Sequence, residues 1–430
     1  SRVGVGMESE INKIESTQKM DFVESLPKLL KDKKVILGVC GSVAIYKSLE
    51  IIRILQKLGA SVRVVMSQSA QEFIKPLLFE AISHHQVLTQ ETQSWGQNPC
   101  NHIELATWGD VFLIAPSTAN TFNKIANGIA DNVLLESFLA FDKIKLVAPA
   151  ANSVMLNNST TSLNKILKEY GSHFVIPPQV KELACGTNGY GALADPLEIV
   201  FNLLRALLKN SFWENCAVCV SGGGSKEAID DVRYLSNFSS GKMGSSLALA
   251  AYFLGANVCF ISSKMPYPLP LDINIKEVES SEDFFNAILS WQKSPFCKSK
   301  QSFLFMNAAI SDYLPKKAHG KLKKQEIGEV WNLQLQENKD ILATLPKVQK
   351  TIGFKLESQT NEEISLQNAQ NALSQKQIDA ICLNTITESK NPLESQQNQI
   401  FWIQDSSVVD LGFCDKFSLA FKILQQAKNL

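Results

Sequence analysis

The residues with the clearest chemical potential lie between Ser221 and Gly244, where the chain reads SGGGSKEAIDDVRYLSNFSSGKMG. A glycine-rich loop follows the apolar segment Ala217–Val220, and a helix is expected to open around Gly241. Glycines let a backbone approach phosphates closely, and a helix N-terminus offers free N–H groups. The spacing is neither GxxxxGK[ST] nor GxGxxG. Loop physics therefore favours nucleotide binding of an unclassified kind over the alternative, a long hydrophilic connection.

The first half of the chain carries small polar residues after each of its predicted strands. Hydroxyl and amide side chains there suit one phosphate and the polar edges of a ring, although Ser and Thr at strand ends are usually only turns and caps. A dinucleotide would call for GxGxxG and an acidic residue about 20 positions later, and the sequence has neither. We therefore predict a mononucleotide such as FMN. The predicted contacts are Gly41, Ser42, Ser67, Ser117, Thr118 and Asn120.

Two further residues of this half could move protons. His102 has a side chain whose pKa near neutrality suits acid–base work, with a structural role as the alternative. Cys185 lies in ACGTNGYG, a glycine-studded segment expected to be exposed and able to move over a ligand. Its alternative is an incidental thiol.

Composition limits the class of protein. The 430 residues are 45% hydrophobic and carry a formal net charge of zero, so substantial cores are possible and nothing favours a nucleic-acid partner. No apolar run reaches the roughly 18 residues of a membrane span, and the polar N-terminus lacks a signal-peptide layout. Nine scattered cysteines fit reduced thiols and a cytoplasmic location. Cys216 and Cys219 are expected to be a buried pair on one face of a strand, not a zinc half-site.

The same order of elements occurs twice. In the first half, the strand Lys34–Val39, the helix Val43–Leu58 and the strand Ser61–Met66 follow one another, and in the second half Ala217–Val220 leads through a helix to Asn257–Ser262. Both helices end on LGAxV, with glycine at the left-handed cap. This predicts two doubly wound, Rossmann-like α/β domains. The predicted segments are an N-terminal extension (1–33), a first domain (34–209) and a second domain (210–430). Further strands are predicted at Val111–Ala115, Ile144–Ala148, Phe303–Asn307, Thr351–Lys355 and Ile378–Asn384.

The motifs of the first half carry a resemblance to a known family. GS…AxYK, MSxSAxxF, HIEL, APSTANT…KxANGxADN, PAAN and ACGxxGxG, spread from about Lys34 to Leu208, resemble FMN-dependent cysteine decarboxylases. They are most similar to the decarboxylase half of the bifunctional phosphopantothenoylcysteine decarboxylase/phosphopantothenate–cysteine ligases. The resemblance implies that His102 bridges flavin and substrate, Asn152 holds the substrate carboxylate and Cys185 donates the last proton. It also implies that the substrate thiol is oxidised by hydride transfer to FMN before CO2 is lost.

Two positions depart from that family. Ala151 replaces the methionine of the usual PAMN, and Ala192 replaces an arginine that commonly follows the cysteine motif. The second change leaves open which cation helps to close the loop. The residues assigned to the chemistry are retained.

The second half resembles the ligase half of the same family, in which a comparable segment ends in SNxSSGKMG. The resemblance implies that Asn237 serves the acyl-cytidylate intermediate, that Lys321 is catalytic, and that Ser239, Ser240 and Lys242 lie near phosphates. The implied CTP contacts are Ala308, Asp312, Lys321, Asn338, Lys339, Asp340, Ile341, Phe354 and Lys376. No metal ligands are assigned, because Mg²⁺ is expected to be held mainly by the CTP phosphates.

The residue types agree with these roles. Asp312 follows an apolar strand, where a carboxylate could read the exocyclic amine of cytosine or hold Mg²⁺. Lys321, Lys323 and Lys324 gather positive charge for a triphosphate, with a solvated surface as the alternative. Phe354 offers an apolar face to the base. Ala372 stands where many relatives have a lysine, which puts one phosphate contact in doubt.

Together these features predict a bifunctional enzyme of coenzyme A biosynthesis. The second domain would join 4′-phosphopantothenate and L-cysteine with CTP, and the first would decarboxylate the product with FMN. The alternatives are an FMN-dependent decarboxylase of another cysteine-containing substrate and a non-catalytic flavin-binding regulator. The family implies a dodecamer of decarboxylase trimers and ligase dimers. The sequence assigns no role to residues 1–33 and does not indicate whether the intermediate is channelled.

Overall fold

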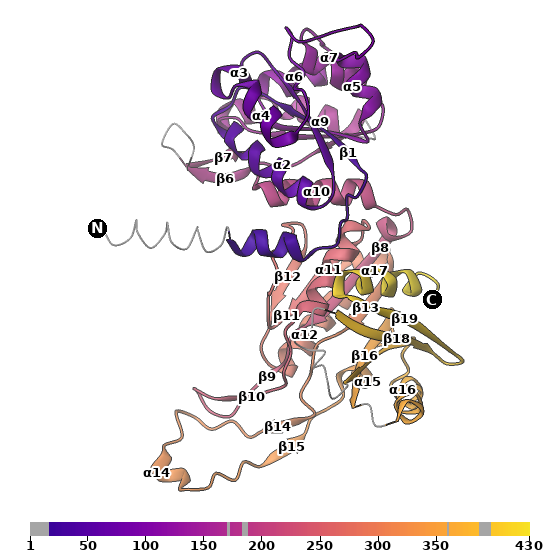
Figure 1. Ribbon diagram of the computed structural model, residues 1–430. Helices are drawn as coiled ribbons and strands as arrows, with labels where there is room; N and C mark the ends of the chain where they lie inside the picture. The colour runs from indigo at the N-terminus through magenta and orange to yellow at the C-terminus, as the bar shows by residue number, and fades with distance from the viewer. Residues whose placement is uncertain (1–16, 170–172, 183–187, 359–360, 387–396) are drawn as a thin grey trace. The chain divides into compact units, whose positions relative to one another are not determined.

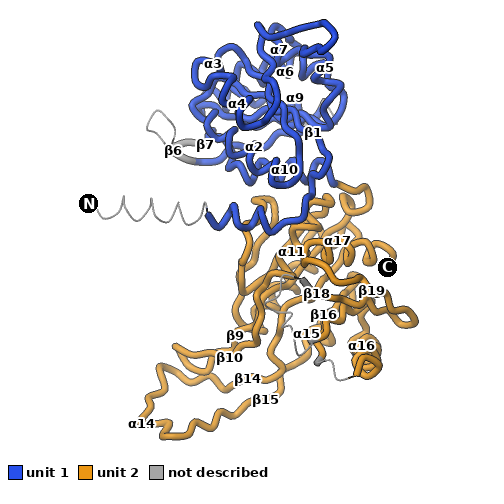
Figure 2. Tube along the Cα trace, in the orientation of Figure 1, with its two compact units in different colours: residues 1–208 blue, residues 209–430 orange. Residues whose placement is uncertain are grey.

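The computed structural model describes residues 17–169, 173–182, 188–358, 361–386 and 397–430. The chain divides into two compact units, residues 1–208 and 209–430 (Figure 2). Each unit is built on its own sheet, and each is described by itself below.

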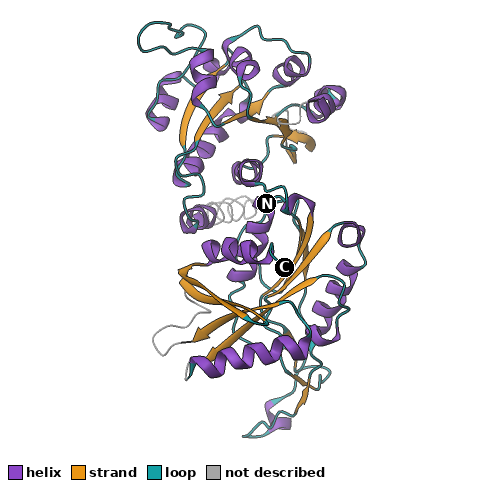
Figure 3. Ribbon diagram, turned by 90° about the vertical axis from the view of Figure 1, so that its right-hand side faces the viewer, coloured by secondary structure: helices purple, strands orange, loops and turns teal. Residues whose placement is uncertain are grey.

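Unit 1 contains a five-stranded parallel sheet in the order β2-β1-β3-β4-β5. Helices lie on both faces of the sheet (Figure 3), which makes the unit doubly wound, as predicted. The strand order reverses between β1 and β3, the position at which such sheets bind ligands. The strands are β1 Lys34–Val39, β2 Ser61–Met66, β3 Val111–Ser117, β4 Ile144–Pro149 and β5 His173–Val175, with a separate hairpin of β6 Gln179–Glu182 and β7 Asn188–Ala192.

The helices of unit 1 pack in two groups. Helix α2 contacts both α4 and α10, and α5 contacts α7 while α6 contacts α9. One core joins the second group to the sheet through residues such as Phe112, Phe122 and Phe138. A helix over residues 17–25 precedes β1. The others are η1 Val43–Tyr46, α2 Lys47–Lys57, α3 Ala70–Phe73, α4 Pro76–Ser83, α5 His102–Trp108, α6 Ala119–Ala126, α7 Val133–Ala140, α8 Ser153–Asn157, α9 Thr160–Glu169 and α10 Pro196–Leu208.

Unit 2 contains an eight-stranded sheet in the order β12-β11-β8-β13-β16-β17-β18-β19. The strands are parallel from β12 to β17, and β18 and β19 add an antiparallel edge. Here the order reverses between β8 and β13. The strands are β8 Cys216–Gly222, β11 Asn257–Ser262, β12 Asn274–Glu277, β13 Gln301–Met306, β16 Lys350–Ser358, β17 Ala380–Ile386, β18 Gln397–Gln404 and β19 Ser407–Asp415.

The helices of unit 2 also form two groups. Helix α17 packs along α11, whereas α12 and α16 join a core with the sheet through residues such as Phe284, Trp291 and Leu373. The helices are η2 Trp213–Asn215, α11 Lys242–Phe253, α12 Ser281–Gln292, α13 Pro295–Ser299, α15 Ile341–Thr344, α16 Glu362–Lys376 and α17 Lys416–Ala427.

Two antiparallel ribbons extend from the sheet of unit 2. The first pairs β9 Lys226–Ala228 with β10 Tyr234–Ser236. The second pairs β14 Tyr313–Pro315 with β15 Leu335–Glu337, and the short helix α14 Lys324–Ile327 lies at its far end (Figure 1). Residues 313–337 are called the arm.

Several predicted elements differ in detail from the observed ones. The predicted helix Val43–Leu58 begins as a 3₁₀ turn, and the α-helix starts at Lys47. The two helix-ending glycines are confirmed, since Gly59 and Gly255 have φ of +97° and +102°. The prediction for Cys216 and Cys219 was half wrong. Both are buried, but residues three apart in a strand point to opposite faces, and only Cys219 belongs to the core of α12 and α16.

Helix α11 lies unusually close to β8 because Gly244 has no side chain. A methyl group added there would lie 3.0 Å from Gly222 Cα and 3.3 Å from Ser221 O. These neighbours belong to the backbone of β8, so they cannot rotate away. Gly244 therefore sets how closely the start of α11 approaches the carboxyl end of β8.

Replacing Gly244 with valine is expected to destabilise unit 2 by about 1–3 kcal/mol, the usual cost of overpacking. The matched control is Gly96→Val, because nothing lies within 4 Å of a Cβ added at Gly96. Differential scanning calorimetry of both variants would show a lower unfolding temperature for Gly244→Val alone. Equal transitions for the two variants would contradict the close contact.

Candidate functional site

The switch point of unit 1 brings together the loops that follow β1 and β2. A Cβ at Gly41 would lie 2.5 Å from Ser69 Oγ, so only glycine fits there. Ser67 is buried, and its hydroxyl lies 3.2 Å from that of Ser69. Ser42 Oγ accepts a hydrogen bond from Ala44 N at 3.2 Å and so begins the next turn. Two predicted contacts, Gly41 and Ser67, thus lie together beside Ser69, and Ser42 follows Gly41 in the same loop.

The loop after β3 is fastened to the loop after β1. Cys40 N donates to Pro116 O at 3.2 Å, and Cys40 Sγ lies 3.2 Å from Thr121 Oγ1. Ser117 is fully buried and donates to Thr118 O. Thr118 caps α6 by accepting from Thr121 N. Asn120 is exposed on the first turn of α6. In this part of the site Thr118 and Asn120 face outward, while Ser117 supports the loop.

His102 is the first residue of α5, where the side chain of Asn101 caps the helix. Its Nδ1 lies 3.1 Å from Gln93 Oε1 and 3.6 Å from Glu136 Oε2. Because both neighbours are acceptors, Nδ1 carries the proton in the neutral ring and Nε2 presents a lone pair. Trp95 packs edge-on at 5.7 Å between ring centroids. The ring is therefore held at one nitrogen and available at the other.

Asn152 is the N-cap of α8, and its side chain uses only the amide oxygen for the cap. Oδ1 accepts from Val154 N and Met155 N, each at 3.0 Å. The cap thereby fixes the amide with its Nδ2 donor on the other side. Asn152 is exposed, so that donor can meet a ligand.

The loop that carries Asn152 is tied to its neighbours on both sides. Ala150 N donates to Ser117 O at 2.9 Å, and Ala151 N donates to Gly191 O at 3.0 Å. The first bond joins it to the end of β3 and the second to β7. Cys185 falls between β6 and β7 in the sequence and lies outside the described residues.

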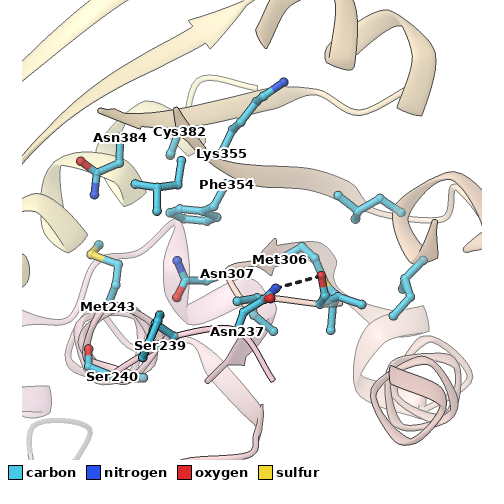
Figure 4. Close-up of a pocket in the computed structure, with 18 of the residues that line it drawn as sticks. Asn237, Ser239, Ser240, Met243, Met306, Asn307, Phe354, Lys355, Cys382 and Asn384 are labelled. Atoms are coloured by element: carbon cyan, nitrogen blue, oxygen red, sulfur yellow. Dashed lines mark hydrogen bonds between the residues drawn. The ribbon is translucent and has the colours of Figure 1, made fainter. Parts of the chain in front are cut away.

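Unit 2 has a cavity of about 690 Å³ at the carboxyl ends of its parallel strands (Figure 4). Among the residues predicted from the sequence, those that line it are Asn237, Ser239, Ser240, Ala308, Asp312, Asp340, Ile341, Phe354 and Lys376. The ring of Phe354 lies beside Asn307 (Figure 4), which places an apolar surface next to an amide, and Asn384 also lines the cavity. The predicted lining residues come from five separate stretches of the sequence.

The glycine run Gly222–Gly224 is part of the framework of this cavity and does not line it. Gly223 O accepts from Ala309 N at 2.8 Å, and Gly224 O accepts from Ser263 Oγ at 2.6 Å. All three glycines are buried. The lining begins later, at Ser236–Gly241, where Asn237 Nδ2 donates to Ile310 O at 3.5 Å. We therefore expect the segment from Ser236 to Gly241, and not these three glycines, to approach phosphates.

Three predicted nucleotide contacts do not line the cavity. Asn338 Nδ2 donates to Ser281 Oγ and to Ser311 O, both at 3.0 Å. The ammonium of Lys339 lies over the ring of Phe285, 3.8 Å from its centroid. Lys321 lies on the arm with Lys323 and Lys324. The first two residues have structural partners, and Lys321 is exposed on the arm.

The arm is anchored near Lys321 by an ion pair that joins it to the β9–β10 ribbon. Asp230 Oδ2 accepts from Arg233 Nη2 at 2.6 Å and from Leu322 N at 3.2 Å. Arg233 also donates to Leu322 O at 2.6 Å and stacks 4.6 Å from the ring centroid of Trp331. The hydrogen bond from Arg233, with those from backbone N–H groups, holds the pKa of the Asp230 carboxyl well below its usual range. The anchor is therefore fully present at neutral pH and is lost only in strong acid.

Several lining residues were missed by the sequence reasoning. They are Met243, Asn307, Lys355, Cys382, Asn384, Asn398, Ile400 and Lys416. Asn398 and Ile400 come from β18, and Lys416 follows β19. This antiparallel edge, formed by β18 and β19, was not predicted from the sequence. The transition from the alternating segment Ser407–Asp415 to a helix capped by Asp415 was the available signal.

A second cavity of about 460 Å³ shares Asp312, Phe354 and Lys376 with the first. Its remaining wall includes one side of α16, with Asn368, Asn371 and Ala372. The alanine that replaces the family's lysine thus borders this cavity. Within the described ranges, no group of three or more His, Cys, Asp or Glu side chains could hold a metal ion. Within the same ranges, no helix combines the length and apolar character needed to cross a bilayer.

Replacing Asp230 with asparagine is expected to release the arm, because Arg233 and Leu322 then lose the carboxylate that joins them. Trypsin should cut at Lys321, Lys323 and Lys324 at least about tenfold faster, since cleavage follows local opening. Asp272→Asn, in the loop before β12, is the matched control. Mass spectrometry of the early fragments checks the result, and unchanged cleavage in Asp230→Asn would contradict the anchor.

Comparison with known proteins identifies relatives for both units. The Flavoprotein family model matches residues 23–208, and the model named DNA/pantothenate metabolism flavoprotein C-terminal domain matches residues 213–430. A solved C-terminal domain of a coenzyme A biosynthesis bifunctional protein, CoaBC, is 28% identical, and the match covers 50% of this chain and 94% of that one with a TM-score of 0.39.

Two curated relatives match almost from end to end. The coenzyme A biosynthesis bifunctional protein CoaBC of Vibrio vulnificus (strain YJ016) is 32% identical over 408 residues, which cover 93% of this chain and 98% of that protein. The protein of the same name from Bacillus subtilis (strain 168) is 33% identical over 415 residues, covering 94% and 98%. With both halves matched in the same order, this chain belongs to the family of bifunctional coenzyme A biosynthesis proteins.

Proposed function

We propose that unit 2 joins 4′-phosphopantothenate to L-cysteine with CTP, and that unit 1 decarboxylates the product with FMN. The observation that carries the proposal is that one chain holds both family regions, each over one unit with a polar site at the switch point of its sheet. Two consecutive reactions on one substrate account for this arrangement. A decarboxylase of another substrate would leave the cavity of unit 2 without a use.

In unit 2 the substrate carboxylate would attack the α-phosphate of CTP and expel pyrophosphate. The cysteine amine would then attack the acyl carbon and expel CMP. Asn237 lies at the cavity wall beside Ile310, and its amide can hold the reacting acyl phosphate. Phe354 offers its ring to the base, and Lys376 lies beside Asp340 at 3.3 Å. Most of the rate enhancement would come from positioning and charge neutralisation, with Mg²⁺ carried by the phosphates.

The residues of unit 1 fit FMN. Gly41 lets the loop after β1 lie against Ser69, because a Cβ there would clash with Ser69 Oγ, and the hydroxyls of Ser42, Ser67 and Thr118 lie at the carboxyl ends of β1, β2 and β3. Sheets of this strand order hold FMN between β1 and β3. When bound, the flavin supplies the acceptance and return of a hydride.

The chain's own residues would bind the substrate and handle protons. His102 presents Nε2 because Gln93 and Glu136 hold Nδ1. Asn152 would donate from Nδ2 to the substrate carboxylate while its Oδ1 keeps the start of α8 in place. We further propose Cys185 as the donor of the final proton. The dodecameric assembly and the cytoplasmic location stay predictions.

Replacing Asn152 with aspartate separates its two roles. A carboxylate still caps α8, but it has no N–H to donate and repels the substrate carboxylate. Decarboxylase activity is expected to fall by about 100-fold, as for a lost charge-assisted hydrogen bond with added repulsion. Flavin absorbance and the unfolding temperature should remain those of the parent. Asn157→Asp, the same change later in α8, is the matched control, and an active Asn152→Asp would overturn the assigned contact.

The two proposed activities can be tested together and then apart. Purified protein supplied with CTP, L-cysteine and 4′-phosphopantothenate should release CMP, CO2 and 4′-phosphopantetheine. Cys185→Ser should stop at 4′-phosphopantothenoyl-cysteine, and Asn237→Asp should block ligation yet still decarboxylate that intermediate when it is added. Liquid chromatography with mass spectrometry distinguishes these products. Colourless protein without CTP-dependent ligation would refute the proposal, and full activity in both variants would refute the site residues.

A further inference from the structure

Lys416 is a buried cation in the cavity of unit 2, and the family resemblance gave it no role. It is the first residue of α17, it is 4% exposed, and it lines the cavity together with Asn398 of the adjacent strand. Among the described residues, no carboxylate lies within ion-pair distance of its ammonium group. A buried charge without a partner is costly, so its retention calls for an explanation.

The other two lysines of the cavity differ in this respect. Lys376 pairs with Asp340 at 3.3 Å, and Lys355 pairs with Glu357 at 3.1 Å. Lys355 also extends away from Phe354 (Figure 4). Both are more than 30% exposed at the side chain. Lys416 is therefore the cavity lysine whose charge the described part of the chain leaves unbalanced.

The surroundings of Lys416 add positive potential. Helix α17 packs along α11. Helix α11 begins at Lys242 after Gly241, which has no side chain to cap it, and Ser240 Oγ accepts from Lys242 N at 3.3 Å. Gly241 and Met243 line the same cavity. Burial first, and then the positive charge of Lys242, lowers the pKa of Lys416 to about 8. A helix N-terminus attracts anions, and here it faces the same cavity as an unpaired buried ammonium group.

We infer that Lys416 binds a phosphoryl group of a substrate in this cavity, together with the N-terminus of α11. The inference rests on the proposed ligase function, because that reaction brings phosphates to unit 2. Two sources share this chemistry: the triphosphate of CTP and the 4′-phosphate of phosphopantothenate. An anion there would compensate both lysines, whereas a neutral ligand would compensate neither.

The test uses the full chain and three variants. Lys416→Met removes the charge but keeps the length, and Lys416→Arg keeps the charge. Lys422→Met is the matched control, because Lys422 lies on the same helix, is exposed and does not line the cavity. Isothermal titration calorimetry gives the Kd for CTP and, separately, for 4′-phosphopantothenate.

In Lys416→Met the Kd for one of the two ligands should rise about 10- to 100-fold, the range for a lost hydrogen bond to a charged group. Lys416→Arg should stay within a few-fold of the parent, as should Lys422→Met. The ligand whose binding weakens identifies the phosphate. Unchanged Kd values for both ligands in Lys416→Met would overturn the inference.

Thermal unfolding without ligand distinguishes binding from a structural role. Replacing an unpaired buried charge with an apolar side chain should raise the unfolding temperature, whereas loss of a structural contact should lower it. Without ligand, Lys416→Met should thus unfold at a higher temperature than the parent. Added ligand should raise that temperature by less than it does in the parent. If Lys416→Met does not fold, Lys416→Gln is measured in its place. If Lys416→Gln also does not fold, the role of Lys416 is structural and the inference fails. If the parent protein binds neither ligand, the ligase proposal itself fails.

Discussion

Both sites depend on one constraint, the divergence of neighbouring loops at a switch point in a parallel sheet. Strands β1 and β3, and likewise β8 and β13, send their chains in opposite directions from adjacent carboxyl ends. A gap opens there, and its walls need support. In unit 1 the bond from Cys40 N to Pro116 O supplies it, and in unit 2 the bond from Ala309 N to Gly223 O does so. Polar side chains placed after these loops can then keep fixed positions without filling the gap.

Much of this framework could be predicted from the sequence, because its signals are local. Apolar runs predicted the parallel strands other than β5 and β12, and the LGAxV endings predicted the two helix stops at Gly59 and Gly255. Roles that depend on distant partners could not be predicted. Nothing near Asn338 in the sequence indicates its bonds to Ser281 and Ser311. Likewise the burial of Lys416 follows from strands β18 and β19, whose polar residues give a weak alternating pattern.

Charge is distributed unevenly between the cavity of unit 2 and its arm. Inside the cavity Lys376 is balanced by Asp340. Outside the cavity, the pair of Asp230 and Arg233 in the β9–β10 turn binds the arm at Leu322, within the cluster of Lys321, Lys323 and Lys324. The arrangement fixes the backbone of the arm beside its basic residues, while the side chains of Lys321, Lys323 and Lys324 are exposed to solvent.

The two hydrogen-bonding roles of the Asn152 amide limit which residues can replace it. Its oxygen is engaged inside the protein at the start of α8, and its nitrogen remains outside. Serine and threonine would have to accept and donate through one hydroxyl oxygen, ionised aspartate has no proton to donate, and glutamine places the amide one methylene too far for the cap. Asparagine meets the two demands with two separate atoms. The oxygen of Asn152 thus serves folding, and the nitrogen of the same amide is left for chemistry.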